Sequence, residues 1–234
     1  GDDSTGPAAT NGWHPNLTFA PNQQFKYSND SLLAGGSGSI RKRNSSTSII
    51  QAQTTYQGEL CYPVTGITYD TVTQQTTPEP PYWFRYDQAS GKFYQYGIRQ
   101  LINITQPGSW DLVGDFDAIR GSSYFIGDIN FTAVVPGLGN VTFTGPLNGV
   151  IADSTTITTT GTPPQTIPCY KISMTATISG TGGITASIVL DYYLGYAAPT
   201  GIVELKLNPF SFFIGGTPVL PQPGFDRKLY THTP

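Results

Sequence analysis

The chain has 234 residues, enough for one large all-β domain or two small domains. Only 12% of its residues are charged, about half of the ~25% usual in soluble domains. The net charge of −3 argues against a nucleic-acid-binding surface, which would need a basic face. The aromatic content of 12% argues against a disordered chain.

The start of the chain shows no strand or helix pattern. It begins at Gly1 without an initiator Met, and residues 1–11 are acidic or small. We therefore expect residues 1–20 to be a flexible tether in a processed chain. Such a tether would follow a cleaved export signal or the acylated cysteine of a bacterial lipoprotein.

Strand-like runs then follow one another, and the 27 glycines, 19 prolines and 14 tyrosines favour strands and turns over helices. The best helix candidate, residues 22–33, has no sustained apolar stripe, and its Ser, Asn and Asp content indicates a loop. The basic cluster Arg41-Lys42-Arg43 lies among Ser and Gly residues and is interpreted as a solvated loop. The strands predicted before residue 160 are residues 48–56, 59–69, 82–87, 92–101, 110–116, 124–135 and 141–151.

The clearest pattern lies in residues 166–207. Apolar residues occupy alternate positions in residues 167–178, 184–194 and 203–207, and glycine-containing turns separate these three runs. Period-two alternation with glycine turns predicts an antiparallel meander with one buried face. Residues 210–214 are predicted to form the last strand.

Polar, proline-rich segments interrupt the strands. Residues 71–81 and 158–166 are predicted surface loops, and residues 215–234 are predicted to be an irregular tail. Residues 21–214 then form a single all-β domain with essentially no helix. Since a sheet must cover its apolar face with another sheet, by closing on itself or with a ligand, we expect an antiparallel meander that forms a β-sandwich or an open or closed β-barrel.

Two cysteines, Cys61 and Cys169, lie in similar settings, each followed by a tyrosine. In an oxidising compartment they could form one disulfide across a long loop, or they could be two buried free thiols. Neither has the CxxC spacing of a redox or zinc site. We therefore expect no metal bound through cysteine, and no cofactor.

Several hairpin-like segments carry a resemblance, and they are residues 82–87, 91–97, 110–112, 167–172 and 192–205. Together they resemble a loose group of small exported bacterial lipoproteins, over roughly residues 48–210. The resemblance implies a curved antiparallel sheet and an envelope location, and it supplies no catalytic residues to transfer. Lipoproteins that carry apolar ligands in half-barrel folds are similar in outline, but they cover the concave face with helices, which this sequence lacks.

Aromatic residues are most concentrated between positions 82 and 110. They could form a packed core, or a stacking platform for sugars or the wall of an apolar pocket. Because Tyr82, Trp83 and Phe84 are consecutive, at least one of these side chains points away from the core if the run is extended. The candidate ligand-binding residues are Tyr82, Trp83, Phe84, Tyr94, Tyr96 and Trp110.

Few residues suggest catalysis. Both histidines, His14 and His232, lie in terminal segments predicted to be irregular, which is a poor setting for the base of a nucleophilic site. Asp115 and Asp117 would share one face of a strand, an arrangement that suits a glycosidase-like pair or a Ca²⁺ site but is also common for solvated carboxylates. We predict no catalytic and no metal-binding residues.

These observations predict an exported, lipid-anchored protein in the periplasm, outer membrane or cell surface of a bacterium. Its predicted role is non-catalytic binding of an apolar or glycan-like ligand. The alternatives are a structural or assembly protein that contacts other envelope proteins, and a carboxylate-dependent glycoside hydrolase. No nucleic-acid partner is expected, and contact with a membrane is expected only through an N-terminal lipid anchor.

Overall fold

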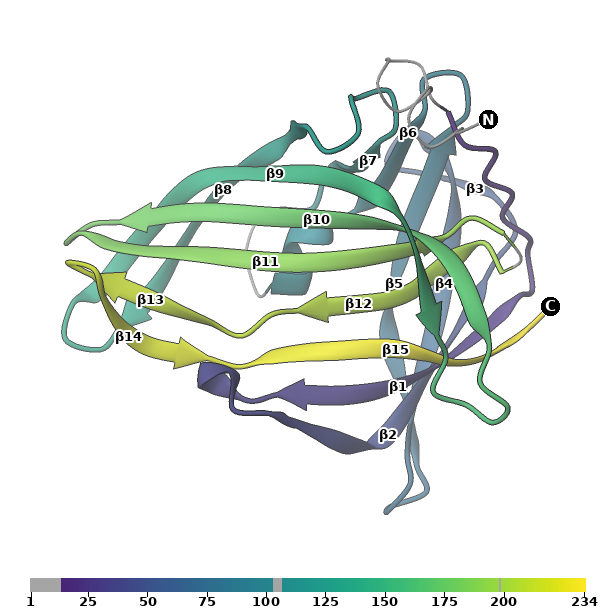
Figure 1. Cartoon of the computed structure of the whole chain (residues 1–234), viewed down its shortest axis with the longest axis horizontal. Helices are drawn as coiled ribbons and strands as arrows, with labels where there is room; N and C mark the ends of the chain where they lie inside the picture. The colour runs from purple at the N-terminus through teal and green to yellow at the C-terminus, as the bar shows by residue number, and fades with distance from the viewer. Residues whose placement is uncertain (1–13, 103–106, 198) are drawn as a thin grey trace.

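The computed structural model describes residues 14–102, 107–197 and 199–234. Most of this part of the chain is antiparallel strand (Figure 1). The strands are β1 (Gln24–Leu32), β2 (Ser39–Ile50), β3 (Thr54–Tyr56), β4 (Glu59–Asp70), β5 (Thr76–Asp87), β6 (Lys92–Tyr96), β7 (Trp110–Asp115), β8 (Ser123–Val135), β9 (Gly139–Thr158), β10 (Thr166–Gly180), β11 (Ile184–Gly195), β12 (Gly201–Leu207), β13 (Phe210–Ile214), β14 (Thr217–Gln222) and β15 (Gly224–Thr233). Two short 3₁₀ turns, η1 (Ala34–Gly36) and η2 (Ile98–Ile102), complete the described elements. None of the helical segments in this part of the chain is long and apolar enough to span a bilayer.

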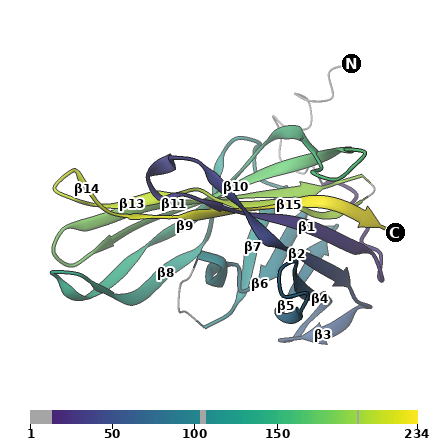
Figure 2. The same ribbon diagram turned by 90° about the horizontal axis from the view of Figure 1, so that it is seen from below.

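The main sheet curls until its two ends approach each other. Its strands follow the order β7-β6-β5-β4-β2-β1-β15-β12-β11-β10-β9-β8, and β7 at one end contacts β8 and β9 at the other. Figure 2 shows β4, β5, β6 and β7 lying below the layer that contains β1, β15, β10 and β11. The all-β prediction is confirmed, and the sheet forms a nearly closed antiparallel barrel.

The predicted meander of residues 166–207 is confirmed as β10, β11 and β12. Ser173 lies opposite Asp191 in the β10–β11 pair, and Asp191 lies opposite Lys206 in the β11–β12 pair. The alternate apolar residues of β10 and β11 are buried, as period-two alternation on a one-sided sheet requires.

Side chains from opposite walls meet inside the barrel. The Tyr192 hydroxyl on β11 donates a hydrogen bond to Gln95 Oε1 on β6 over 3.0 Å. The rings of Tyr192 and Phe93 are also in contact, with centroids 6.1 Å apart. Because β6 and β11 are far apart in the sheet order, these contacts cross the interior and fill part of it.

An ion pair joins the two ends of the sheet. Arg99 on η2 contacts the Asp111 carboxylate on β7 at 2.9 Å and donates to the Asp128 carbonyl on β8 over 2.7 Å. Burial raises the pKa of Asp111, and the guanidinium of Arg99 opposes that rise. Arg99 therefore bridges the gap between β7 and β8.

Two segments predicted to be irregular are in fact strands inside the main sheet. Residues 22–33 contain β1, and residues 215–234 contain β14 and β15; the tail prediction is therefore wrong. β1 pairs with β2 and β15, and β15 also pairs with β12. The apolar alternation of β15 was not recognised in the sequence because a charged residue, Arg227, takes the alternate position between Phe225 and Leu229.

The segment 71–81 is only partly the predicted loop, because β5 begins at Thr76. Three prolines are tolerated in this part of β5 because it pairs only with β4, so one of its edges needs no backbone donor. The pairing with β6 begins at Phe84. The basic cluster Arg41-Lys42-Arg43 likewise lies in β2 rather than in a loop, and Arg41 pairs with Asp30 on β1. The segment between β9 and β10 is a loop, as predicted.

The disulfide alternative is wrong, and both thiols are free and buried. Cys61 lies on β4 and Cys169 on β10, and β2, β1, β15, β12 and β11 separate these two strands in the sheet. Each Sγ atom instead lies 3.4 Å from a backbone carbonyl oxygen, that of Thr54 for Cys61 and that of Ile167 for Cys169.

The position of β15 predicts that the C-terminal residues stabilise the fold. Leu229 is fully buried, so Leu229→Ala should lower the free energy of unfolding by about 2–5 kcal/mol. The matched substitution Leu60→Ala, at a side chain that is 59% exposed, should change it by less than about 0.5 kcal/mol. Urea unfolding measures both, and equal small effects would contradict the placement of β15.

Candidate ligand-binding site

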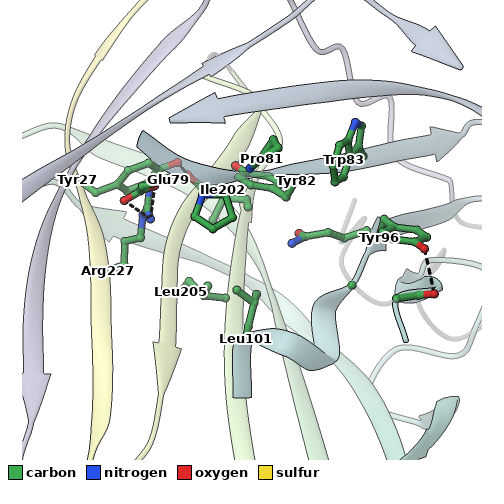
Figure 3. A pocket seen from close by; sticks show the side chains of 14 residues that line it. Tyr27, Glu79, Pro81, Tyr82, Trp83, Tyr96, Leu101, Ile202, Leu205 and Arg227 are labelled. Atoms are coloured by element: carbon green, nitrogen blue, oxygen red, sulfur yellow. Dashed lines mark hydrogen bonds and ion pairs between the residues drawn. The ribbon is translucent and has the colours of Figure 1, made fainter. Parts of the chain in front are cut away.

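A cavity of about 610 Å³ lies inside the barrel, within the ~300–1,000 Å³ typical of small-molecule sites. Its lining comes from β1, β12 and β15 on one side and from β5, β6 and η2 on the other (Figure 3). These two groups of strands are not neighbours in the sheet, so the cavity lies between opposite walls of the barrel. The labelled lining residues are Tyr27, Glu79, Pro81, Tyr82, Trp83, Tyr96, Leu101, Ile202, Leu205 and Arg227.

A bulge in β5 shapes the cavity wall. Val64 of β4 lies opposite Tyr82, and Gly66 lies opposite Glu79, so the two prolines between Glu79 and Tyr82 face the single residue Thr65 and β5 has one extra residue. Proline suits such a position because a bulge leaves a residue outside the ladder of hydrogen bonds. A Cβ atom at Gly66 would lie 2.9 Å from Glu79 Oε2. Glycine at this position therefore leaves room for the Glu79 carboxylate.

An ion pair forms the polar end of the cavity. Arg227 Nη1 lies 3.1 Å from Glu79 Oε2, and Arg227 Nη2 donates to Ser48 Oγ over 3.0 Å. The Thr68 hydroxyl donates to Glu79 Oε1 over 2.7 Å. The guanidinium also lies 4.5 Å from the centre of the Tyr27 ring, in a cation–π contact.

The pKa of Glu79 reflects these contacts. Burial alone would raise the pKa of this carboxyl, but Arg227 and the hydrogen bonds from Thr68 and Ser46 outweigh burial and lower it. Burial raises the pKa of Tyr82 to about 12, and that of Tyr27 is raised for the same reason. At neutral pH the cavity therefore holds the carboxylate of Glu79, the guanidinium of Arg227 and the neutral phenols of Tyr27 and Tyr82.

The six predicted ligand-binding residues divide into two groups of three. Tyr82, Trp83 and Tyr96 line the cavity, each of them half-buried. The other three, Phe84, Tyr94 and Trp110, do not line the cavity.

Several of these aromatic side chains pack against neighbouring side chains instead of forming a free surface. Trp83 stacks on Tyr56 of β3, with ring centroids 3.7 Å apart and an interplanar angle of 2°. Trp110 packs edge-on against Tyr96 at 5.5 Å, and the Arg85 guanidinium lies over the Tyr94 ring at 4.0 Å. Trp83 is therefore not the exposed stacking platform that one sequence alternative envisaged.

Phe84 belongs to the packed interior. It is almost fully buried, and its ring lies 4.5 Å from that of Phe19 and 5.8 Å from that of Phe93. The position of Phe84 in the core therefore does not fit the prediction that it binds a ligand.

The predicted carboxylate pair does not form a catalytic arrangement. β7 ends at Asp115, so Asp117 lies in the following turn and does not share a strand face with it. Asp115 contacts Lys92 at 3.1 Å, and the half-exposed Asp117 contacts His14 at 3.0 Å. Neither aspartate is part of the cavity lining. Within the described ranges, no group of three or more His, Cys, Asp and Glu side chains could hold a metal ion.

Sequence reasoning missed the polar end of the cavity. Glu79 lies in a segment predicted to be a loop, and Arg227 lies in the predicted tail. The available signal was the alternation of Phe225, Arg227 and Leu229, which places the arginine on the same face as two apolar residues.

The ion pair predicts a pH-dependent contribution to stability. Because the pKa of Glu79 in the folded protein is lowered from its ordinary value of 4.5, the pair contributes fully above that pH and its contribution is lost as the pH falls below it. Glu79→Gln should lower the free energy of unfolding by roughly 1.5–3 kcal/mol at pH 7 and by less at pH 3.

Urea unfolding of both proteins at the two pH values tests this expectation. The control is Glu59→Gln, because the Glu59 side chain is 44% exposed and its contact with Arg85 is 3.7 Å long; its effect should stay within about 0.5 kcal/mol. An effect of Glu79→Gln that is equal at both pH values would contradict the ionic contribution.

No protein-family model matches the sequence, and no curated protein matches it. Two solved structures are similar to this chain over nearly its whole length. One is described as an exported protein with a YmcC-like fold from Bacteroides fragilis; it covers 96% of this chain and 100% of its own, with 11% identity and a TM-score of 0.49. The other is described as a lipoprotein from Parabacteroides distasonis; it covers 94% of this chain and 100% of its own, with 9% identity and a TM-score of 0.54. The second likeness shows a shared fold, which agrees with the curved antiparallel sheet implied by the resemblance to exported bacterial lipoproteins.

Proposed function

We propose that this chain is an exported, lipid-anchored envelope protein that binds an apolar ligand in the barrel cavity without chemical conversion. The observation that carries the proposal is the cavity of about 610 Å³ between opposite walls of the barrel, with its largely apolar and aromatic lining. A cavity of this kind binds apolar molecules because it removes their surface from water.

The charges of the cavity support binding rather than catalysis. The carboxylate that lines it, Glu79, is paired with Arg227 at 3.1 Å and has a lowered pKa. A general acid or base works best with a pKa near the working pH, and a glycoside hydrolase needs two carboxyl groups flanking its substrate. Among the described lining residues, Glu79 is the single carboxylate.

Two observations support an envelope location. The charged fraction of 12% is low, and the structure with the shared fold from Parabacteroides distasonis is described as a lipoprotein. The prediction of a flexible tether over residues 1–20 is wrong for its last part, because Leu17 and Phe19 are buried in the core. The anchor would belong to the chain before them.

The binding role predicts a measurable affinity for an apolar probe. N-phenyl-1-naphthylamine, whose emission rises in apolar surroundings, should bind to the wild-type protein with saturation. Ile202→Glu places a charge in the cavity lining and should weaken this binding at least about tenfold, because the apolar probe would then lie against a charged group that loses its hydration.

The matched control is Ile119→Glu, at a residue that is 48% exposed in a turn. This variant should bind the probe like the wild type, and circular dichroism should show that both variants are folded. Equal probe binding by the two folded variants, or no saturable binding by the wild type, would refute the proposed site.

A second candidate function, a structural or assembly role, is favoured by one separate observation. Three hairpins at one end of the barrel contain long stretches without a charged residue, namely 129–152, 172–190 and 207–225. The large apolar side chains exposed on them are Val134, Leu138, Phe213 and Ile214. Exposed apolar residues on an uncharged surface are typical of a protein contact. Light scattering should then show self-association that Val134→Asp removes, whereas a monomer at all concentrations would argue against a contact between copies.

A further inference from the structure

A second, polar depression adjoins the cavity. We call it the polar groove; it has a volume of about 270 Å³ and is lined mainly by side chains of β1, β2, β4 and β15. Four residues line both spaces: Glu79, Leu101, Leu205 and Arg227. The two spaces are therefore contiguous, and the Glu79–Arg227 pair lies at their junction.

The lining of the polar groove differs from that of the cavity. Its neutral polar groups are the amides of Asn29 and Asn44 and the hydroxyls of Ser46 and Thr68. Lys42, which also lines it, is exposed, so the groove opens to solvent. A molecule that occupied both spaces would meet apolar side chains inside the barrel and hydrogen-bonding groups toward its mouth.

The amide groups of the groove are held in position. Asn29 Nδ2 donates to Asn44 Oδ1 and to Ser46 Oγ, each over 3.1 Å. Within the described part of the chain, these bonds leave Asn29 Oδ1 and Asn44 Nδ2 without a partner. One free acceptor and one free donor on neighbouring strands form a pair that a hydroxyl-bearing group can satisfy.

The charges around the groove balance. Its carboxylates are Asp30, Glu79 and Asp226, and its cations are Lys42 and Arg227, with Arg41 paired to Asp30. The lining residues themselves carry one net negative charge, and Arg41, which pairs with Asp30 beside the groove, offsets it. The groove therefore has no strong excess of either charge to attract an ionic head group, whereas the hydroxyls of a neutral head group can replace their hydrogen bonds to water with bonds to the groove.

We propose that the cavity and the polar groove form one site for an amphiphile with an alkyl chain and an uncharged, hydroxyl-bearing head group such as a sugar. The chain lies in the barrel, and the head group lies in the groove between Asn29, Asn44 and Thr68. This inference rests on the proposed binding function and specifies the chemical class of its ligand.

Displacement of N-phenyl-1-naphthylamine tests the head-group preference. The competitors are n-decyl β-D-maltoside, decanoate and decyltrimethylammonium, which share a chain of about ten carbons and are used below their micelle concentrations. The maltoside should displace the probe at concentrations at least about tenfold lower than either charged competitor. Asn44→Ala should weaken the affinity for the maltoside about three- to tenfold, which corresponds to the loss of one to two neutral hydrogen bonds. The affinity for decanoate should not change.

The control variant is Asn140→Ala, which removes an exposed asparagine of the hairpin between β8 and β9. It should leave the affinities for all three competitors unchanged, and thermal unfolding should show that both variants are folded. If the probe binds but the three competitors act equally, or if Asn44→Ala has no effect on the maltoside, the inference is wrong while the proposed function stands. If the probe itself does not bind, both are wrong.

Discussion

An antiparallel sheet with one apolar face has to cover that face, and this chain has no α-helix among its described elements to do so. The sheet therefore curls until β7 contacts β8 and β9, and its own strands enclose the apolar side chains. Closure also protects the long edges of the sheet from pairing with other chains. The Arg99 contacts to Asp111 and to the Asp128 carbonyl bridge the remaining gap. The enclosed interior, and with it the candidate site, follows from this one requirement.

The interior is only partly filled. Around Tyr192 and Phe93 the opposite walls are in contact, whereas beside the β5 bulge they remain apart and the cavity results. The Glu79–Arg227 pair lies where that cavity meets the polar groove, and burying it has a cost in desolvation. Apolar packing at these positions would often stabilise the fold as well or better. The proposed ligand site gives the pair a role beyond stability, because its charges mark the boundary between the apolar and the polar lining.

Period-two alternation made the fold class predictable from the sequence. It was strongest in residues 166–207, where every second residue is apolar, and those strands are present with the predicted faces. The same pattern did not reveal β1 and β15, because polar residues and Arg227 occupy positions that the pattern expects to be apolar. Backbone pairing with a neighbouring strand on each side stabilises these two strands instead. The candidate site was half predictable: Tyr82, Trp83 and Tyr96 belong to an obvious aromatic cluster. Glu79 and Arg227 could not be predicted as part of the site, because their ion pair joins positions 148 residues apart in the sequence.

The central claim is that the cavity holds an apolar ligand in the cell. Native mass spectrometry of the protein purified from its own host, with an organic extract analysed in parallel, tests it most directly. We predict a reproducible mass excess that disappears on extraction and is absent from Ile202→Glu purified in the same way. A bare polypeptide mass for both proteins would contradict the account and favour a role in assembly.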